Sequence, residues 1–90
     1  MLLDKVKIAL RISGNAFDDD ISDSIAAAKR DLQQSGIAKS NDDNDPLILR
    51  AIKTYCKSDY AADEKEAERY RLSYDLLKNH LSLASDYTEE

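Results

Sequence analysis

The sequence predicts an all-α protein, most simply a small bundle of four helices. In four separate segments, apolar residues recur at spacings of three and four, which is the spacing of one face of an α-helix. The only two glycines and the single proline fall at the ends of these segments, where helices start and stop. No stretch shows the strict alternation of apolar and polar residues that is typical of a half-buried strand.

The first predicted helix covers about residues 2–12 and ends before Gly14. Its apolar residues lie on one broad face, so this face should pack against the other helices. The face consists of Leu2, Leu3, Val6, Ala9 and Leu10, and Ile8 and Ile12 widen it.

The second predicted helix begins in the three aspartates at 18–20 and runs to Ser35. These carboxylates can cap free N–H groups and complement the positive end of the helix dipole. Gly36 follows as the expected C′ residue. The buried seam is predicted at Ile21, Ile25, Ala28 and Leu32.

Residues 37–44 show neither helix nor strand periodicity, and they predict a mobile loop between the second and third helices. The loop is polar, and its second half is acidic. A segment of this kind can become ordered on a partner. The residues expected to do so are Asn41, Asp42, Asp43 and Asn44.

The third predicted helix starts at Asp45 and Pro46, which are read as the N-cap and the first helical position, and it ends near Tyr60. One side of this helix is apolar and the other is basic. The apolar arc holds Ile48, Ala51, Ile52, Tyr55 and Cys56, and the opposite side carries Arg50, Lys53 and Lys57.

The fourth predicted helix covers about residues 64–83, after a break near Asp63. The alternative is that the third and fourth helices continue as one kinked rod. The main apolar stripe holds Ala67, Tyr70, Tyr74, Leu77 and Leu81. Residues 1–83 thus form one helical domain, and residues 84–90, which have no stripe, are expected to be a loose C-terminal tail.

The fourth helix also carries a second apolar face, roughly 160° from the first when each residue advances about 100°. It consists of Leu72, Leu76 and Leu83. Either this helix runs through the centre of the bundle, or these leucines only flank the core, or they form an interface with another subunit or a partner.

The basic residues Arg50, Lys53 and Lys57 form a short stripe on an otherwise acidic chain. One interpretation is an ordinary solvated helix face. The other is pairing with an acidic surface of another subunit, for example the aspartates at 18–20 or the loop at 42–45, which would set register more than affinity.

The composition of the chain argues against several classes of protein. With 13 Lys and Arg against 18 Asp and Glu, the formal net charge of the 90 residues is −5, which argues against a nucleic-acid surface built on net positive charge. No apolar run is long enough to span a bilayer, charges interrupt the start where a signal peptide would be apolar, and a single cysteine cannot form an internal disulfide. We expect a protein of the reducing cytoplasm.

No residue pattern indicates an enzyme, a metal site or a cofactor. Both acidic clusters fail the EF-hand spacing, since the sixth residue counted from Asp18 or from Asp42 is not glycine. Cys56 lies on an apolar arc and is expected to be a small buried residue, and His80 is expected at the surface or at an interface. The isolated glycines cannot form a phosphate-binding loop.

The order and spacing of the segments resemble the head-tail connector family of long-tailed bacteriophages and prophages, whose members are also called adaptor or head-completion proteins. The resemblance spans nearly the whole chain. The matching segments are residues 3–12 (LDKVKIALRI), 18–21 (DDDI), 25–28 (IAAA), 45–48 (DPLI), 51–55 (AIKTY), 73–78 (SYDLLK) and 81–83 (LSL).

This resemblance implies a structural virion protein without enzymatic activity, located at the head-tail junction and assembled in the cytoplasm of the bacterial host. It implies a homo-oligomeric ring of about a dozen subunits that docks on the portal protein, extends the DNA channel and offers a surface to the tail or stopper protein. DNA would pass through without specific binding, and no membrane or cofactor is expected. The interface residues predicted on this basis are Leu72, Leu76, Leu83, Arg50, Lys53 and Lys57.

The rival hypothesis is a small helical regulator that binds DNA through a helix-turn-helix made of the second and third helices. Such a motif needs a turn of about three to four residues. The segment 37–44 is longer, and the chain is acidic.

Overall fold

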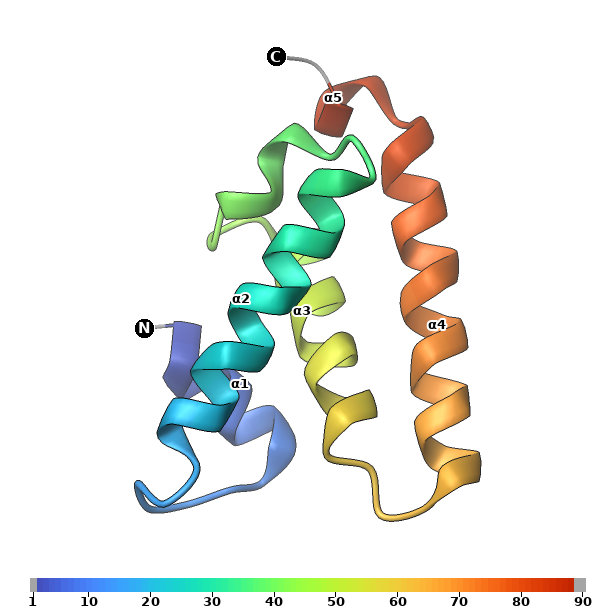
Figure 1. The fold of residues 1–90 in the computed structure, drawn as a ribbon. Helices are drawn as coiled ribbons and strands as arrows, with labels where there is room; N and C mark the ends of the chain where they lie inside the picture. The colour runs from blue at the N-terminus through green and yellow to red at the C-terminus, as the bar shows by residue number, and fades with distance from the viewer. Residues whose placement is uncertain (1, 89–90) are drawn as a thin grey trace.

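The computed structural model describes residues 2–88 of the chain, which form five α-helices and one short 3₁₀ helix joined by loops (Figure 1). This part contains no strand, so the all-α prediction is confirmed. The elements are α1 (Leu2–Leu10), α2 (Asp18–Gln34), the 3₁₀ helix η1 (Ala38–Asn41), α3 (Pro46–Asp59), α4 (Glu64–Leu83) and α5 (Ser85–Thr88).

The middle of the molecule is occupied by α3, which packs against α1, α2 and α4 (Figure 1). Its predicted apolar arc is confirmed, because Ile48, Ala51, Ile52 and Cys56 are fully buried and Tyr55 is partly buried against the core. The bundle core therefore forms around α3, and α4 lies on one side of it. The idea that the fourth helix runs through the centre of the bundle is wrong.

The predicted helix starts at Asp45 and Asp63 are confirmed. The Asp45 carboxylate accepts hydrogen bonds from the backbone N–H groups of Leu47 at 2.9 Å and Ile48 at 3.2 Å. The Asp63 carboxylate accepts one from the N–H of Glu66 at 2.8 Å. Both contacts satisfy donors that have no partner within the helix. Helices α3 and α4 are thus separate rather than one kinked rod.

The two ends of α2 differ in how well the sequence predicted them. Gly36 follows the helix with a φ of 87°, a left-handed conformation that glycine adopts without steric cost, as expected for C′. At the start, the predicted capping by aspartates is wrong, because Phe17 is the N-cap residue and no side chain caps it. The aspartates lie in the first turn, where they complement the helix dipole, and Asp18 pairs with Lys7 at 2.7 Å.

The segment 37–44 contains helical structure and buried residues that were not predicted. It contains η1, and Ile37 and Ser40 are buried. An ion pair of 2.8 Å joins Asp43 to Lys29 of α2. The expectation of a loop without helix is therefore wrong for Ala38–Asn41, because one buried isoleucine anchors a segment that has no apolar periodicity.

The predicted loose tail also forms a helix where the structure describes it. Over residues 85–88 the chain forms α5, and Tyr87 packs against the core. Its hydroxyl donates a hydrogen bond of 3.1 Å to the Asp45 carboxylate, and the Lys39 ammonium lies 5.6 Å from the centre of its ring. A single aromatic residue thus attaches the end of the chain to η1 and the start of α3. Residues 89 and 90 of the predicted tail lie outside the described residues.

One side chain assigned to the core of the first helix is instead exposed. Val6 is buried as expected, but Ile8 has 76% of its surface exposed. These two residues are about 200° apart around a helix of about 100° per residue, so they point in nearly opposite directions. The prediction that Ile8 widens the core face is wrong.

Candidate functional site

The outer face of α4 carries three of the five large hydrophobic side chains that are exposed among the described residues. Leu72 and Leu76 are each 61% exposed, and Leu83 is 87% exposed. The buried residues of the same helix are Ala67, Tyr74 and Leu81, on the side toward α3. The leucines therefore neither lie in a central helix nor belong to the core, and no part of residues 2–88 covers their face.

A shallow groove of about 500 Å³ surrounds Leu72 at the start of this face. The other residues that line this groove are charged, and they include both acidic and basic side chains that can form ion pairs with a partner. These residues are Asp63, Lys65, Glu68 and Arg69. Neither Lys65 nor Arg69 forms an ion pair within residues 2–88.

The basic stripe of α3 forms a second, separate surface. Arg50 is exposed, whereas Lys53 and Lys57 are half-buried. The three line a groove of about 530 Å³ in which α4 contributes Ser73 and none of its exposed leucines. The Lys57 ammonium lies 5.7 Å from the centre of the Tyr70 ring, which engages part of its charge within the chain. The structure thus separates the basic stripe from the leucine face.

The predicted partner-ordered loop contains one anchored residue and three freely accessible ones. Asp43 is half-buried and paired with Lys29. Asn41, Asp42 and Asn44 are exposed. These three are the ones available to a partner.

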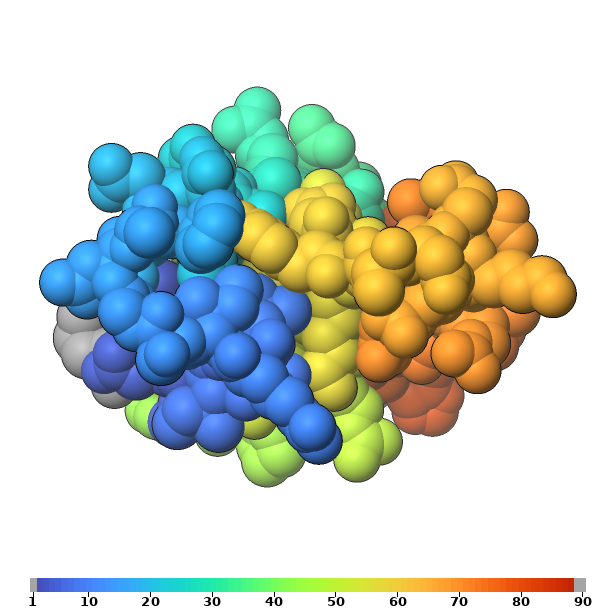
Figure 2. Space-filling view, turned by 90° about the horizontal axis from the view of Figure 1, so that it is seen from below, coloured from blue at the N-terminus to red at the C-terminus, as the bar shows by residue number. Residues whose placement is uncertain are grey.

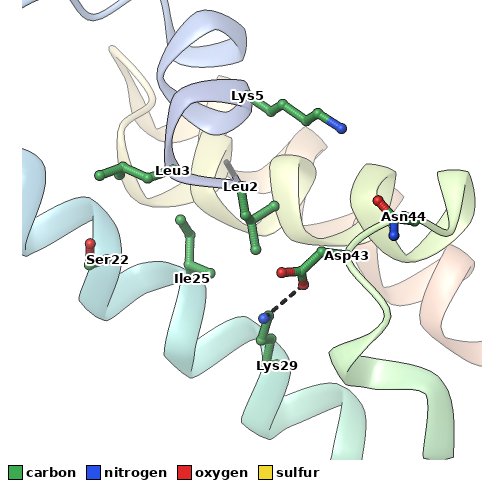
Figure 3. A pocket seen from close by; sticks show the side chains of 8 residues that line it. All are labelled: Leu2, Leu3, Lys5, Ser22, Ile25, Lys29, Asp43 and Asn44. Atoms are coloured by element: carbon green, nitrogen blue, oxygen red, sulfur yellow. Dashed lines mark ion pairs between the residues drawn. The ribbon is translucent and has the colours of Figure 1, made fainter.

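A groove of about 510 Å³ opens beside this loop, on the edge formed by α1 and α2 (Figure 3). Leu2 and Ile25 point toward each other across it, and the Lys29–Asp43 ion pair closes one side (Figure 3). Its remaining lining residues are Leu3, Lys5, Ser22 and Asn44. No pattern in the sequence indicates this groove, because three separate segments form it and no local spacing links them.

A polar cluster connects α2 and α4, and it was also missed. The Tyr74 hydroxyl donates a hydrogen bond of 2.6 Å to Asp31, and the Lys78 ammonium donates one of 3.0 Å to the same carboxylate oxygen. Burial alone would raise the pKa of Asp31, but these two hydrogen bonds and the Lys78 charge outweigh it and hold the pKa below its usual value. Burial and the bond to Asp31 raise the pKa of Tyr74.

The two residues considered for catalysis, Cys56 and His80, lie on different helices, α3 and α4. Cys56 is buried, and burial, with a smaller effect from Asp59, raises the pKa of its thiol to about 12. A thiol that stays protonated is a poor nucleophile. His80 is exposed on α4. Within residues 2–88, no three His, Cys, Asp or Glu side chains converge as a metal site would require, and none of the helices has the length and apolarity to cross a bilayer.

Comparison with known families decides between the hypotheses. A family model described as "Phage connector protein" matches residues 2–88, which include every helix from α1 to α5. The chain belongs to the phage connector protein family. The resemblance predicted from the sequence is thus confirmed, and it gives this protein a structural role as a phage connector. No curated protein and no solved structure matches the chain.

The architecture of this connector protein gives no support to the helix-turn-helix hypothesis. Residues 35–45 join α2 to α3 through η1, where a helix-turn-helix has a tight turn. The described residues of the connector protein present three accessible surfaces. These are the leucine face of α4, the basic stripe of α3 and the groove between α1 and α2.

Proposed function

We propose that this connector protein forms a closed homo-oligomeric ring at the head-tail junction of a phage particle. The ring docks on the portal protein, extends the DNA channel and offers an attachment surface to the tail or stopper protein. The observation that carries the proposal is the uncovered leucine face of α4. Membership of the connector family supports the same role.

The leucine face has a clear reason to be covered by protein. Leu72 and Leu76 lie one helical turn apart, and each leaves most of its side chain in water. Burying the exposed part of each would stabilise an interface by about 1 to 2 kcal/mol. Two such residues at the centre of a contact are enough to make association sensitive to a single substitution.

Charged groups would set the register of the contacts. The stripe of Arg50, Lys53 and Lys57 is opposite in charge to the aspartates at 18–20 and the acidic loop at 42–45 of another subunit, or to an acidic surface of the portal. The exposed loop residues Asn41, Asp42 and Asn44 are placed to become ordered against such a partner.

The net charge fits a channel through which DNA slides. With a formal charge of −5 per chain, a ring repels the phosphate backbone on average, and the favourable counterion release that accompanies DNA binding is absent. DNA would then pass without being held. The basic stripe is consistent with this role if it is covered by a protein partner.

The proposal is tested by the assembly state of the purified protein, alone and mixed with its portal protein. Negative-stain images and light scattering after size exclusion should show rings, at high concentration or on the portal. Leu76→Asp should weaken ring formation by about tenfold or more and leave the far-UV helix signal unchanged, because Leu76 is mostly exposed.

A matched control is Ala26→Asp, which places the same charge on an exposed position of α2. This variant should assemble as the parent does. If neither the free protein nor the protein on the portal forms rings, the proposed function is wrong. If Leu76→Asp unfolds the monomer, the leucine belongs to the fold, and the interface assignment is wrong.

A further inference from the structure

We propose that the leucine face of α4 in one copy packs on Ile8 and Phe17 of the next copy, so that subunits associate head to tail. The inference rests on the proposed ring and names the surface that the leucine face contacts. It is carried by the positions of the exposed apolar residues, their directions and the charges beside them.

The exposed large apolar residues of the described chain fall into two groups. One group lies at α1 and the start of α2, where Ile8 is 76% exposed and Phe17 is 50% exposed. The other group is the leucine face of α4. Together they account for every large apolar side chain that residues 2–88 leave exposed: Ile8, Phe17, Leu72, Leu76 and Leu83.

The two groups lie on opposite sides of the molecule. Helices α1 and α4 both pack against α3, and Figure 2 shows α1 and the start of α2 at one end, α4 at the other and α3 between them. Ile8 is about 200° around α1 from the buried Val6, and Leu72 is about 200° around α4 from the buried Tyr74. Ile8 and Leu72 therefore both point away from the buried sides of their helices, which lie on either side of α3.

This placement favours a second copy as the occupant and a head-to-tail contact as its geometry. The two patches of one chain cannot reach each other. A two-fold contact between two α4 helices would leave the Ile8 patch of both copies in water. A head-to-tail contact covers both patches in every copy, and it closes into a ring when the rotation between copies allows.

Within the described residues, acidic groups without an ion pair lie beside Phe17, and basic groups without an ion pair lie beside Leu72 in a groove of mixed charge. Phe17 directly precedes the aspartates of α2, of which Asp19 and Asp20 form no ion pair within residues 2–88. Leu72 lies in a groove that has two basic groups, Lys65 and Arg69, and two acidic groups, Asp63 and Glu68. Pairing the basic pair with the aspartates would fix which way the copies meet.

The test uses cross-linking between single-cysteine additions. Two full-length variants, Ile8→Cys and Leu76→Cys, are mixed in equal amounts, with and without the portal protein, and treated with a short bismaleimide. Both positions are exposed, so neither change should disturb the fold. The parent chain is the control, because its Cys56 is buried and protonated. Mass spectrometry of the peptides should find adducts between positions 8 and 76.

A second experiment uses charge to block each patch in turn. Ile8→Asp and Leu76→Asp should each weaken assembly by about tenfold or more, whereas Ala26→Asp should not. An equal mixture of the two blocked variants retains one intact contact and should form dimers that do not grow into rings.

The outcomes separate this inference from the proposed function. Adducts between two copies of position 76, or rings that form without any adduct between positions 8 and 76, overturn the head-to-tail pairing and leave the ring intact. Normal assembly of the Ile8→Asp variant would also overturn the head-to-tail pairing and leave the ring intact. The absence of rings both in free solution and on the portal overturns the proposed function, and the pairing with it.

Discussion

Tyr74 of α4 donates a hydrogen bond of 2.6 Å to Asp31 of α2, although 43 residues separate them in the sequence. Both helices pack against α3, and this bond connects them directly to each other. Tyr55 of α3 supports the arrangement, because its ring meets that of Tyr74 edge to face with 5.2 Å between centroids. One tyrosine thus joins the three longest helices of the bundle.

Replacing this tyrosine should lower stability without changing the fold. Tyr74→Phe keeps the ring contact and removes the hydrogen bond to a carboxylate, so the free energy of unfolding should fall by about 1 to 2 kcal/mol. Urea unfolding followed by circular dichroism measures the change. Tyr70→Phe is the control and should have little effect, because the Tyr70 ring keeps its contact with Lys57. Equal effects of the two substitutions would contradict a special role for Tyr74.

The same carboxylate makes stability depend on pH. The pKa of Asp31 in the folded protein lies below its usual value of 3.8, so the folded state favours the charged form. The stabilisation is therefore fully present above about pH 5 and is lost as the pH falls through the folded pKa. We expect the difference in unfolding free energy between the parent and Asp31→Asn to shrink between pH 6 and pH 3. A difference that stays constant over this range would show that Asp31 does not contribute in this way.

Asp45 should matter more for stability than Asp63, although both cap helices. Asp45 accepts bonds from two backbone amides and from the Tyr87 hydroxyl, whereas Asp63 accepts one amide bond. Asp45→Ala should cost about 2 kcal/mol and Asp63→Ala about 1 kcal/mol. Thermal and urea unfolding give both values. Tyr87→Phe removes only the tyrosine bond and should by itself lower the free energy of unfolding by part of this difference. A null effect of Tyr87→Phe would show that α5 does not depend on this bond.

Cys56 should resist thiol reagents while the protein is folded. Its side chain is buried and the pKa of its thiol is raised to about 12, so almost no thiolate exists at pH 8. Labelling with Ellman's reagent should be slow in buffer and rapid in concentrated urea. Rapid labelling of the native protein would mean that α3 opens or that the thiol is exposed.

The starts of α3 and α4 and the end of α2 were predictable because local chemistry sets them. Asp45 and Asp63 supply acceptors for free N–H groups, and Gly36 adopts the left-handed conformation that ends α2. The spacing of apolar residues likewise predicted which positions of α3 are buried. These features depend on residues within about one or two turns of each other.

The candidate surfaces were only partly predictable. A second apolar face on α4 was evident from the spacing of Leu72, Leu76 and Leu83, but the spacing does not say whether another helix covers that face. The groove between α1 and α2 gave no signal, because its lining residues come from three segments. The exposure of Ile8 was missed for a related reason, since its helix is apolar on several sides.

The sequence by itself determined the helical fold class, the starts of α3 and α4, the end of α2 and the connector family, because periodicity, capping residues and segment order are local or linear properties of the chain. Only the tertiary structure decided that α3 is central, that Tyr87 folds back on Asp45, and that Ile8 and the leucines of α4 face solvent at opposite ends. The physical reason is that burial depends on which helices pack together, and those contacts join residues far apart in the chain.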